Sequence, residues 1–388
     1  MEPSRPQPLA SRLQGFGTTI FTEMTALAQA HDAVNLGQGF PDFDGPPAVL
    51  DGAIEAIRAG HNQYGRLQGV PDLNRAVAEH QERHYGLRYD ADAEVTAFAG
   101  ATEAIHGALL ALCEPGDEVI VLEPCYDCYR PAIAMADAVA VAVHLAPPRF
   151  QVDAAAIEAA VTPRTRAILL NSPLNPTGTV LSRAELEGIA DICRRHDLLA
   201  ITDEVYEHLV YDVEHVPIAT LPGMRERTVT ISSAGKTFSV TGWKVGWACA
   251  NAPVADALRS AKQFTTFCSG TPLQLAVAAG LRLGDAFLAG LAAEYRARRD
   301  RLCEGLERAG LDVLVPEGTY FVLADVRPLG FEDDMAFCRE LPARAGVAAI
   351  PLSAFQREDP PRHLARFAFC KTDAVLDEGI RRLARLRG

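Results

Sequence analysis

The sequence predicts an α/β protein in which a large domain with mostly parallel strands precedes a smaller C-terminal α/β unit. Short apolar runs alternate with helix-prone segments, which is typical of parallel sheets with crossover helices. At 388 residues and 48% hydrophobic composition, the chain is long enough for two domains with substantial cores. We expect an N-terminal arm and small-domain segment at 1–45, the large domain at 46–285 and the C-terminal small domain at 286–388.

Five short apolar runs are expected to form buried strands of the large domain. They lie at 95–98, 119–122, 167–170, 198–202 and 228–231. A helix-prone stretch at 287–309 is expected to link the large domain to the small one, which has strand-like runs and a last helix. Those segments lie at 318–323, 347–350, 364–369 and 373–386.

The composition of the chain indicates which kinds of partner it can bind and in which cellular compartment it is found. A net charge of −13 argues against nucleic acid or an anionic membrane surface as a partner. We find no apolar run of about 20 residues and no apolar signal-peptide core in residues 1–8. Nine scattered cysteines do not form a disulfide framework and suit a reducing compartment. We therefore expect a cytoplasmic protein.

Lys236 is the most informative residue, because it follows an expected strand in the small-residue segment 232–235. Ligands in open α/β sheets bind beyond the carboxyl ends of the strands. A lysine amine becomes an imine-forming nucleophile when desolvation and neighbouring positive charge lower its pKa, and Lys244 is a candidate for that charge. A lone lysine in such a turn is usually solvated. A pyridoxal phosphate site must therefore be completed by other segments.

The groups that such a cofactor requires all occur after expected strands. Asp203 can keep the pyridinium nitrogen protonated, and Tyr206 and Asn175 are candidate donors to the ring hydroxyl. Tyr126 could lie flat on the ring. The phosphate needs a Gly-containing turn at a helix N-terminus together with further polar groups. The expected phosphate ligands are Gly100, Ala101, Thr102, Ser233 and Lys244.

Two other patterns indicate metal or redox chemistry only weakly. Cys125 and Cys128 form a C-x-x-C, but no second pair accompanies them, so a closed zinc site lacks half its ligands. His80 and His84 stand one helical turn apart without the glutamate of the zincin motif. We expect a solvated helix face there and no metal.

The chain closely resembles the class I/II aminotransferases, which are fold-type I pyridoxal-phosphate enzymes. Within them it is similar to the kynurenine, glutamine and methionine aminotransferase-like branch. The motifs occur in the family's order at 35–42, 62–64, 171–178, 203–206, 232–247 and 366–367. The resemblance implies a seven-stranded, mostly parallel sheet and pyridoxal phosphate as cofactor. It also implies ping-pong transfer of an amino group between an L-amino acid and a 2-oxo acid.

The resemblance also implies residue roles. Lys236 would bind the cofactor covalently and carry the proton between the substrate Cα and the cofactor C4′. Arg366 would clamp the substrate α-carboxylate, because a guanidinium can hold it bidentately. Gly39 and Asn175 would assist. Tyr64 matches a tyrosine that reaches the phosphate of the neighbouring subunit, which predicts a homodimer with shared active sites.

Several substrates stay open. Phe21, Phe264 and Phe267 predict an apolar pocket for methionine, glutamine-like or aromatic side chains, while Cys125 leaves its width undetermined. The chain is also similar to the N-succinyldiaminopimelate aminotransferases, whose substrate carries distal carboxylates that Arg66 could meet. The same site could run β-elimination from cysteine conjugates. A transcription regulator would need a basic DNA-binding module, for which residues 1–45 are too short.

Overall fold

The computed structural model describes residues 10–17 and 19–387, and its main feature is a seven-stranded sheet. The strand order is β2-β8-β7-β6-β5-β3-β4, and β8 is antiparallel to both of its neighbours while the other pairs are parallel. The predicted mostly parallel sheet is confirmed. Its strands are β2 (Val95–Phe98), β3 (Glu118–Glu123), β4 (Val139–His144), β5 (Thr165–Asn171), β6 (Leu199–Asp203), β7 (Thr228–Ser233) and β8 (Gly246–Cys249).

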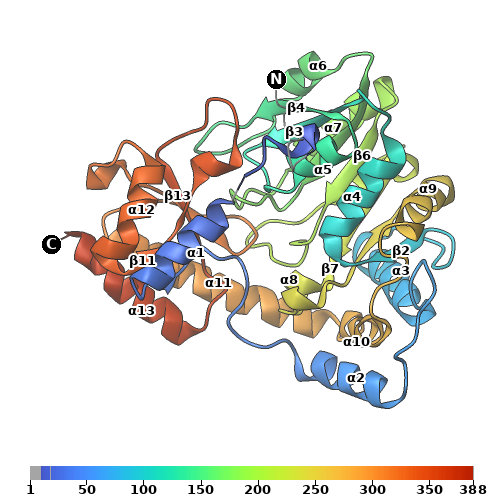
Figure 1. Cartoon of the computed structure of the whole chain (residues 1–388), viewed down its shortest axis with the longest axis horizontal. Coiled ribbons are helices and arrows are strands. Elements are labelled where there is room, and N and C mark those ends of the chain that lie inside the picture. The colour runs from blue at the N-terminus through green and yellow to red at the C-terminus, as the bar shows by residue number, and fades with distance from the viewer. Residues whose placement is uncertain (1–9, 18, 388) are drawn as a thin grey trace, which may run out of the picture.

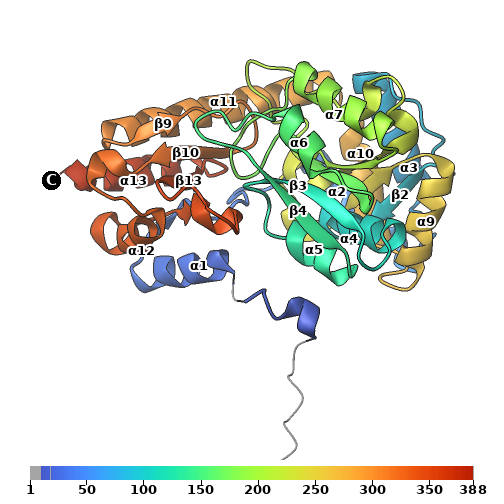
Figure 2. The ribbon, with the colours of Figure 1, turned by 90° about the horizontal axis from the view of Figure 1, so that it is seen from above.

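Helices cover both faces of this sheet, as Figure 2 shows for the pair α4 and α5 on one side and the pair α6 and α7 on the other. Successive side chains of a strand point to opposite faces, so a strand buried on both faces is apolar throughout. In β3, Val121 packs into the cluster of α4 and α5, and Ile120 packs into the cluster of α7. The helices are α4 (Gly100–Leu112), α5 (Tyr129–Met135), α6 (Ala154–Ala160), α7 (Arg183–Arg195) and α9 (Ala252–Gln263).

A third helical group lies at the β2 and β8 end of the sheet (Figure 1). Its buried side chains include Val49, Val77 and Val277, which pack with Trp247 of β8. The helices are α2 (Pro47–Arg58), α3 (Pro71–Tyr85), α8 (Ala234–Thr237) and α10 (Thr271–Leu281).

The smaller C-terminal unit contains a four-stranded antiparallel sheet in the order β12-β13-β10-β9. The N-terminal strand β1 pairs in parallel with β11, so the start of the chain joins this unit, and Figure 1 shows α1 beside α12. Its elements are α1 (Ile20–Ala30), β1 (Val34–Asn35), α11 (Asp285–Arg308), β9 (Asp312–Leu314), β10 (Phe321–Asp325), α12 (Asp334–Ala345), β11 (Val347–Ala348), β12 (Ile350–Pro351), β13 (Leu364–Ala368) and α13 (Asp373–Leu383). Short 3-10 helices span Ser11–Leu13, Ile218–Thr220, Arg225–Arg227, Thr241–Trp243, Arg327–Leu329, Leu352–Phe355 and Ala384–Arg387.

Some expected boundaries differ from the structure. The strand predicted at 318–323 begins only at Phe321, because Thr319 has a φ of 66°, which is outside the extended region. The run 347–350 divides at Ala349 into β11 and β12. The predicted domain limits at 45 and 285 stay a proposal, and residues 1–9 of the predicted arm lie outside the described residues.

Within the described ranges, no single helix is long and apolar enough to cross a membrane. Helices α10 and α11 meet the length and composition criterion only as a pair, with a bend of 91° between them.

Candidate active site

A cavity of about 280 Å³ opens beyond the carboxyl ends of β5, β6 and β7, where residues of the small unit close it. It brings together thirteen of the fourteen predicted site residues. They are Phe21, Gly39, Gly100, Ala101, Thr102, Tyr126, Asn175, Asp203, Tyr206, Ser233, Lys236, Lys244 and Arg366. The fourteenth, Tyr64, lies outside the cavity with 87% of its surface exposed.

Lys236 lies in the short helix α8, directly after β7, and its amine points into the cavity. Its Nζ donates a hydrogen bond to Tyr320 Oη at 2.8 Å, and that hydroxyl donates to the Gly39 carbonyl at 2.5 Å. Burial lowers the pKa of Lys236 to about 8, although the charge of Asp203 opposes the shift. The amine therefore loses its proton more readily than an ordinary lysine does, as a nucleophile requires.

Asp203 ends β6 and is buried. Tyr129 Oη donates a hydrogen bond to Asp203 Oδ2 at 2.8 Å. Burial raises the pKa of Asp203 to about 6, while the hydrogen bond from Tyr129 acts in the opposite direction. A cation placed beside this carboxylate would favour its ionised form, so Asp203 fits a pyridinium nitrogen.

The start of α4 forms an anion cradle. The N-cap residue Ala99 provides no side-chain cap, and among the described residues no side chain accepts a hydrogen bond from the N–H groups of the first turn, so these groups can meet a ligand. Gly100 has a φ of 81°, and a Cβ on it would lie 3.1 Å from Lys244 Nζ. A Cβ on Gly246 would lie 2.6 Å from the Gly100 carbonyl carbon, so both glycines are needed for the close approach of β8 to α4. The cationic Lys244 and the free N–H groups, with Ser233 at the rim, fit a phosphate.

Aromatic and amide side chains line the space between Asp203 and the anion cradle. Tyr126 meets Tyr129 edge to face, with ring centroids 5.7 Å apart, and Tyr206 meets Tyr320 at 5.2 Å. Asn175 is fixed by its backbone N–H, which donates to Asn171 Oδ1 at 2.8 Å. These groups fit a flat heteroaromatic ring with a polar substituent, so the whole donor set suits pyridoxal phosphate.

Arg366 lies in the middle of β13 and is 1% exposed. Its Nη1 donates to Asn175 Oδ1 at 2.8 Å and its Nη2 to the Gly37 carbonyl at 3.1 Å, while Nε has no partner among the described residues. Its guanidinium carbon lies 3.9 Å from the ring centroid of Phe321. Burial lowers the pKa of Arg366 to about 10. No carboxylate of the described residues forms an ion pair with it, so the cation is available to a carboxylate ligand.

Sequence reasoning missed Tyr320, Tyr129 and Asp127, of which the last two line the cavity. Tyr320 lies in a run that was expected to form a strand, and only the fold brings its hydroxyl to Lys236. Asp127 follows the predicted Tyr126 directly, and burial raises its pKa. Asp127 could have been predicted as a site residue from its position after an expected strand.

Four residues considered for the substrate pocket lie elsewhere in this chain. Phe264 is 89% exposed and Phe267 is 37% exposed, and neither lines the cavity. Arg66 donates to Asp92 Oδ1 at 2.7 Å outside the cavity. Cys125 is buried with an unpaired thiol, whose pKa is raised by burial. In a single chain, the apolar wall of the cavity therefore comes from Phe21 and Phe321 instead.

Known proteins share this architecture and sequence. The chain matches the family Aminotransferase class I and II over residues 31–383. It is 53% identical to a probable N-succinyldiaminopimelate aminotransferase of Mycobacterium tuberculosis, covering 96% of this chain and 97% of that protein. It is 43% identical to the methionine aminotransferase of Escherichia coli strain K12, covering 97% of this chain and 98% of that protein.

A solved structure of N-succinyldiaminopimelate aminotransferase from Mycobacterium tuberculosis superimposes with a TM-score of 0.95, covering 97% of this chain and 100% of that chain. The likeness thus extends over both sheets, and the resemblance stated from the motifs is confirmed. The present protein is an aminotransferase that belongs to the family of class I and II aminotransferases.

Proposed function

We propose that the protein is a pyridoxal-phosphate-dependent aminotransferase that works by ping-pong chemistry at the cavity around Lys236. The observation that supports this most is the buried amine of Lys236, with its pKa lowered to about 8, in one cavity with Asp203 and the anion cradle of α4. Gly100, Ala101, Thr102, Ser233 and Lys244 would hold the phosphate. Asp203 would hold the ring nitrogen, Asn175 and Tyr206 the ring hydroxyl, and Tyr126 the ring face.

The residues of this chain would share the reaction as follows. Arg366 binds the α-carboxylate of the amino acid and fixes the orientation of its Cα, with Asn175 and the Gly39 backbone assisting. Lys236 would then act as the base that takes the proton from the substrate Cα and as the acid that returns it. Tyr320 Oη is an acceptor that orients the Lys236 amine. When bound, pyridoxal phosphate supplies the electron sink for the charge that this proton transfer leaves behind.

For the amino donor we propose an L-amino acid with an uncharged side chain, of the methionine, glutamine or aromatic type. The described residues that line the cavity include three cations, Lys236, Lys244 and Arg366, and all three already have proposed roles. The carboxylate of Asp127 also lines it and would repel a second anionic group. Phe21 and Phe321 add apolar walls. The acceptor would be a 2-oxo acid.

N-succinyldiaminopimelate is the second candidate donor, and the 53% identity to the mycobacterial protein favours it. It would require a cation for its distal carboxylates, for which Arg66 is the candidate. In a single chain Arg66 pairs with Asp92. β-Elimination from a cysteine conjugate is a third reaction that the same residues could support.

We further propose a cytoplasmic homodimer in which Tyr64 reaches the partner's active site. Tyr64 and Phe264 are 87% and 89% exposed, and the Tyr64 ring lies edge-on to Phe267 at 5.7 Å. Large exposed rings of this kind are enriched in interfaces. The nine free cysteines support a reducing compartment.

A single-turnover experiment tests the proposed chemistry and the substrate together. The cofactor-loaded protein is mixed with methionine, glutamine, phenylalanine, kynurenine, aspartate, N-succinyldiaminopimelate or a cysteine conjugate, without an oxo-acid acceptor. We expect one equivalent of pyridoxamine phosphate per site, formed fastest with methionine or an aromatic amino acid. A faster reaction with N-succinyldiaminopimelate would establish the second candidate. Ammonia release without pyridoxamine phosphate would identify a β-lyase.

A further inference from the structure

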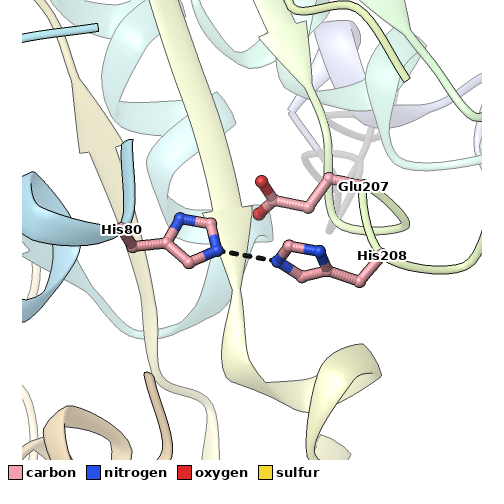
Figure 3. A group of neighbouring side chains, drawn as sticks. All are labelled: His80, Glu207 and His208. Atoms are coloured by element: carbon pink, nitrogen blue, oxygen red, sulfur yellow. Dashed lines mark hydrogen bonds between the residues drawn. The ribbon is translucent and has the colours of Figure 1, made fainter. Parts of the chain in front are cut away.

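Three side chains with metal-binding atoms meet outside the active site. His80 belongs to α3, whereas Glu207 and His208 follow β6. The Nε2 atoms of the two histidines lie 2.7 Å apart, and a ligand atom of each of the three residues lies within 4.8 Å of the others. Figure 3 shows the two rings pointing at each other with the Glu207 carboxylate beside them. His80 and Glu207 are buried, and His208 is half-buried.

We propose that His80, Glu207 and His208 bind one zinc-like divalent transition metal ion. Two imidazole nitrogens and one carboxylate oxygen are a ligand set that Zn²⁺ uses when its fourth position is taken by water or another group. Imidazole donors favour Zn²⁺, Co²⁺, Ni²⁺ or Cu²⁺, whereas Mg²⁺ and Ca²⁺ prefer sites made of oxygen atoms alone.

The two histidines and the carboxylate would have to adjust to hold such an ion, because the three ligand atoms lie within 4.8 Å of one another. With metal bonds of about 2.1 Å, a tetrahedral site separates its ligand atoms by roughly 3.4 Å. The two Nε2 atoms, now 2.7 Å apart, would have to move apart by less than about 1 Å. His208 is the one of the three that is half-buried. At the present distance the two nitrogens share one proton, so at least one of them already offers a lone pair.

The surroundings of the cluster resemble the outer shell of a metal site. Glu207 Oε1 accepts a hydrogen bond from Ser232 Oγ and Oε2 accepts one from Tyr85 Oη, both at 2.6 Å. Such bonds fix the orientation of a ligating carboxylate.

A third histidine, His84, lies beside the cluster. Its ring centroid lies 4.6 Å from that of His80 and 5.4 Å from that of His208. The solvated helix face predicted for His80 and His84 is therefore wrong for His80, which is 4% exposed. His84 is half-buried.

A bound metal would be structural. It would tie α3 to the segment directly after Tyr206, and so connect a peripheral helix to a strand end that borders the active site. None of the three ligands lines the active-site cavity. Loss of the metal should therefore change stability far more than the chemistry at Lys236.

Cobalt titration tests the proposal on the cofactor-loaded protein after treatment with a chelator. We expect one Co²⁺ per chain, with the visible absorption bands of a four- or five-coordinate ion. His80→Gln and His208→Gln should each weaken the affinity for Co²⁺ at least tenfold. Tyr85→Phe should weaken it roughly tenfold, because it removes the hydrogen bond from Tyr85 that orients the Glu207 carboxylate. Circular dichroism shows whether each variant is folded.

His196→Gln is the matched control, because His196 is a partly exposed histidine that contacts Glu158 at 2.8 Å. It should leave the Co²⁺ affinity unchanged. The proposal is overturned if the wild-type protein binds no Co²⁺, if His80→Gln and His208→Gln bind it as the wild type does, or if His196→Gln removes the binding.

Discussion

Replacing Arg366 with methionine should separate the function of this residue from its contribution to stability. Arg366 is a buried cation that pairs with no carboxylate in the described part of the chain, and burial lowers its pKa from 12.5 to about 10. A shift of this size corresponds to roughly 3 kcal/mol of cost for carrying the charge in its buried position. Because the pKa is lowered, the cost is present at every pH below about 10. A bound substrate carboxylate would offset it.

The expected effect on binding follows from the two charged hydrogen bonds that a carboxylate would receive. Each contributes on the order of 1.5–3 kcal/mol, so their loss should lower kcat/KM for methionine at least about 100-fold. The methionine side chain introduced at position 366 should fit among the rings of Phe21, Phe321 and Phe355, which surround the Arg366 guanidinium. Removal of the unpaired charge offsets the hydrogen bonds lost at Asn175 and Gly37. We expect the free energy of unfolding to change by no more than about 1 kcal/mol.

The assay compares the half-reaction of methionine with that of 3-(methylthio)propylamine, which lacks the carboxylate. The wild-type protein should prefer methionine strongly, and Arg366→Met should lose this preference. Arg299→Met is the control, because Arg299 is also buried but pairs with Asp300 and Asp212. It should lower the thermal midpoint and keep the preference. If Arg366→Met still prefers methionine at least 100-fold, Arg366 does not bind the carboxylate.

Three further predictions concern the cofactor and the dimer. The rate at which the apo chain combines with pyridoxal phosphate should rise with pH up to about 8 and level off above it, because Lys236 reacts only as the neutral amine. Stopped-flow absorbance measures this rate. A rate that does not change with pH would contradict the role of Lys236. Tyr129→Phe removes a hydrogen bond that lowers the pKa of Asp203, so this pKa should rise above about 6. As the pH is lowered, the variant should therefore lose its affinity for the cofactor at a higher pH than the wild type does. Equilibrium dialysis measures this affinity. Mixing Tyr64→Ala with Lys236→Ala chains should restore activity that neither has alone, because one site of the mixed dimer is then fully wild type; absence of recovery in verified mixed dimers would refute the shared site.

Local sequence patterns predicted those parts of the fold whose structure is determined by neighbouring residues in the sequence. The strand 95–98 has its predicted bounds, because a buried apolar run stops at the glycine that opens α4. Lys236, Asp203 and Asn175 were found because each directly follows a strand end or a turn, and the topology of a parallel sheet brings such ends together.

The missed features depend on contacts between distant segments. Tyr320 is an aromatic residue in an apolar run, and only the packing of the small unit brings its hydroxyl to Lys236, 84 positions away. His80 was expected in solvent, but His208, 128 positions away, covers it. The conformation of Thr319, which delays the start of β10, likewise has no signal in its neighbouring residues.

The two sheets contribute different parts of the active site, and this has an evolutionary consequence. The residues proposed to hold the cofactor follow strands of the seven-stranded sheet, whereas Phe21, Phe321 and Arg366 come from α1 and the small sheet. Substitutions at Phe21 and Phe321 can therefore alter which side chain is accepted without disturbing the groups that are proposed to hold the cofactor. An ancestor with this division could acquire new donors through changes on one side of the cavity alone.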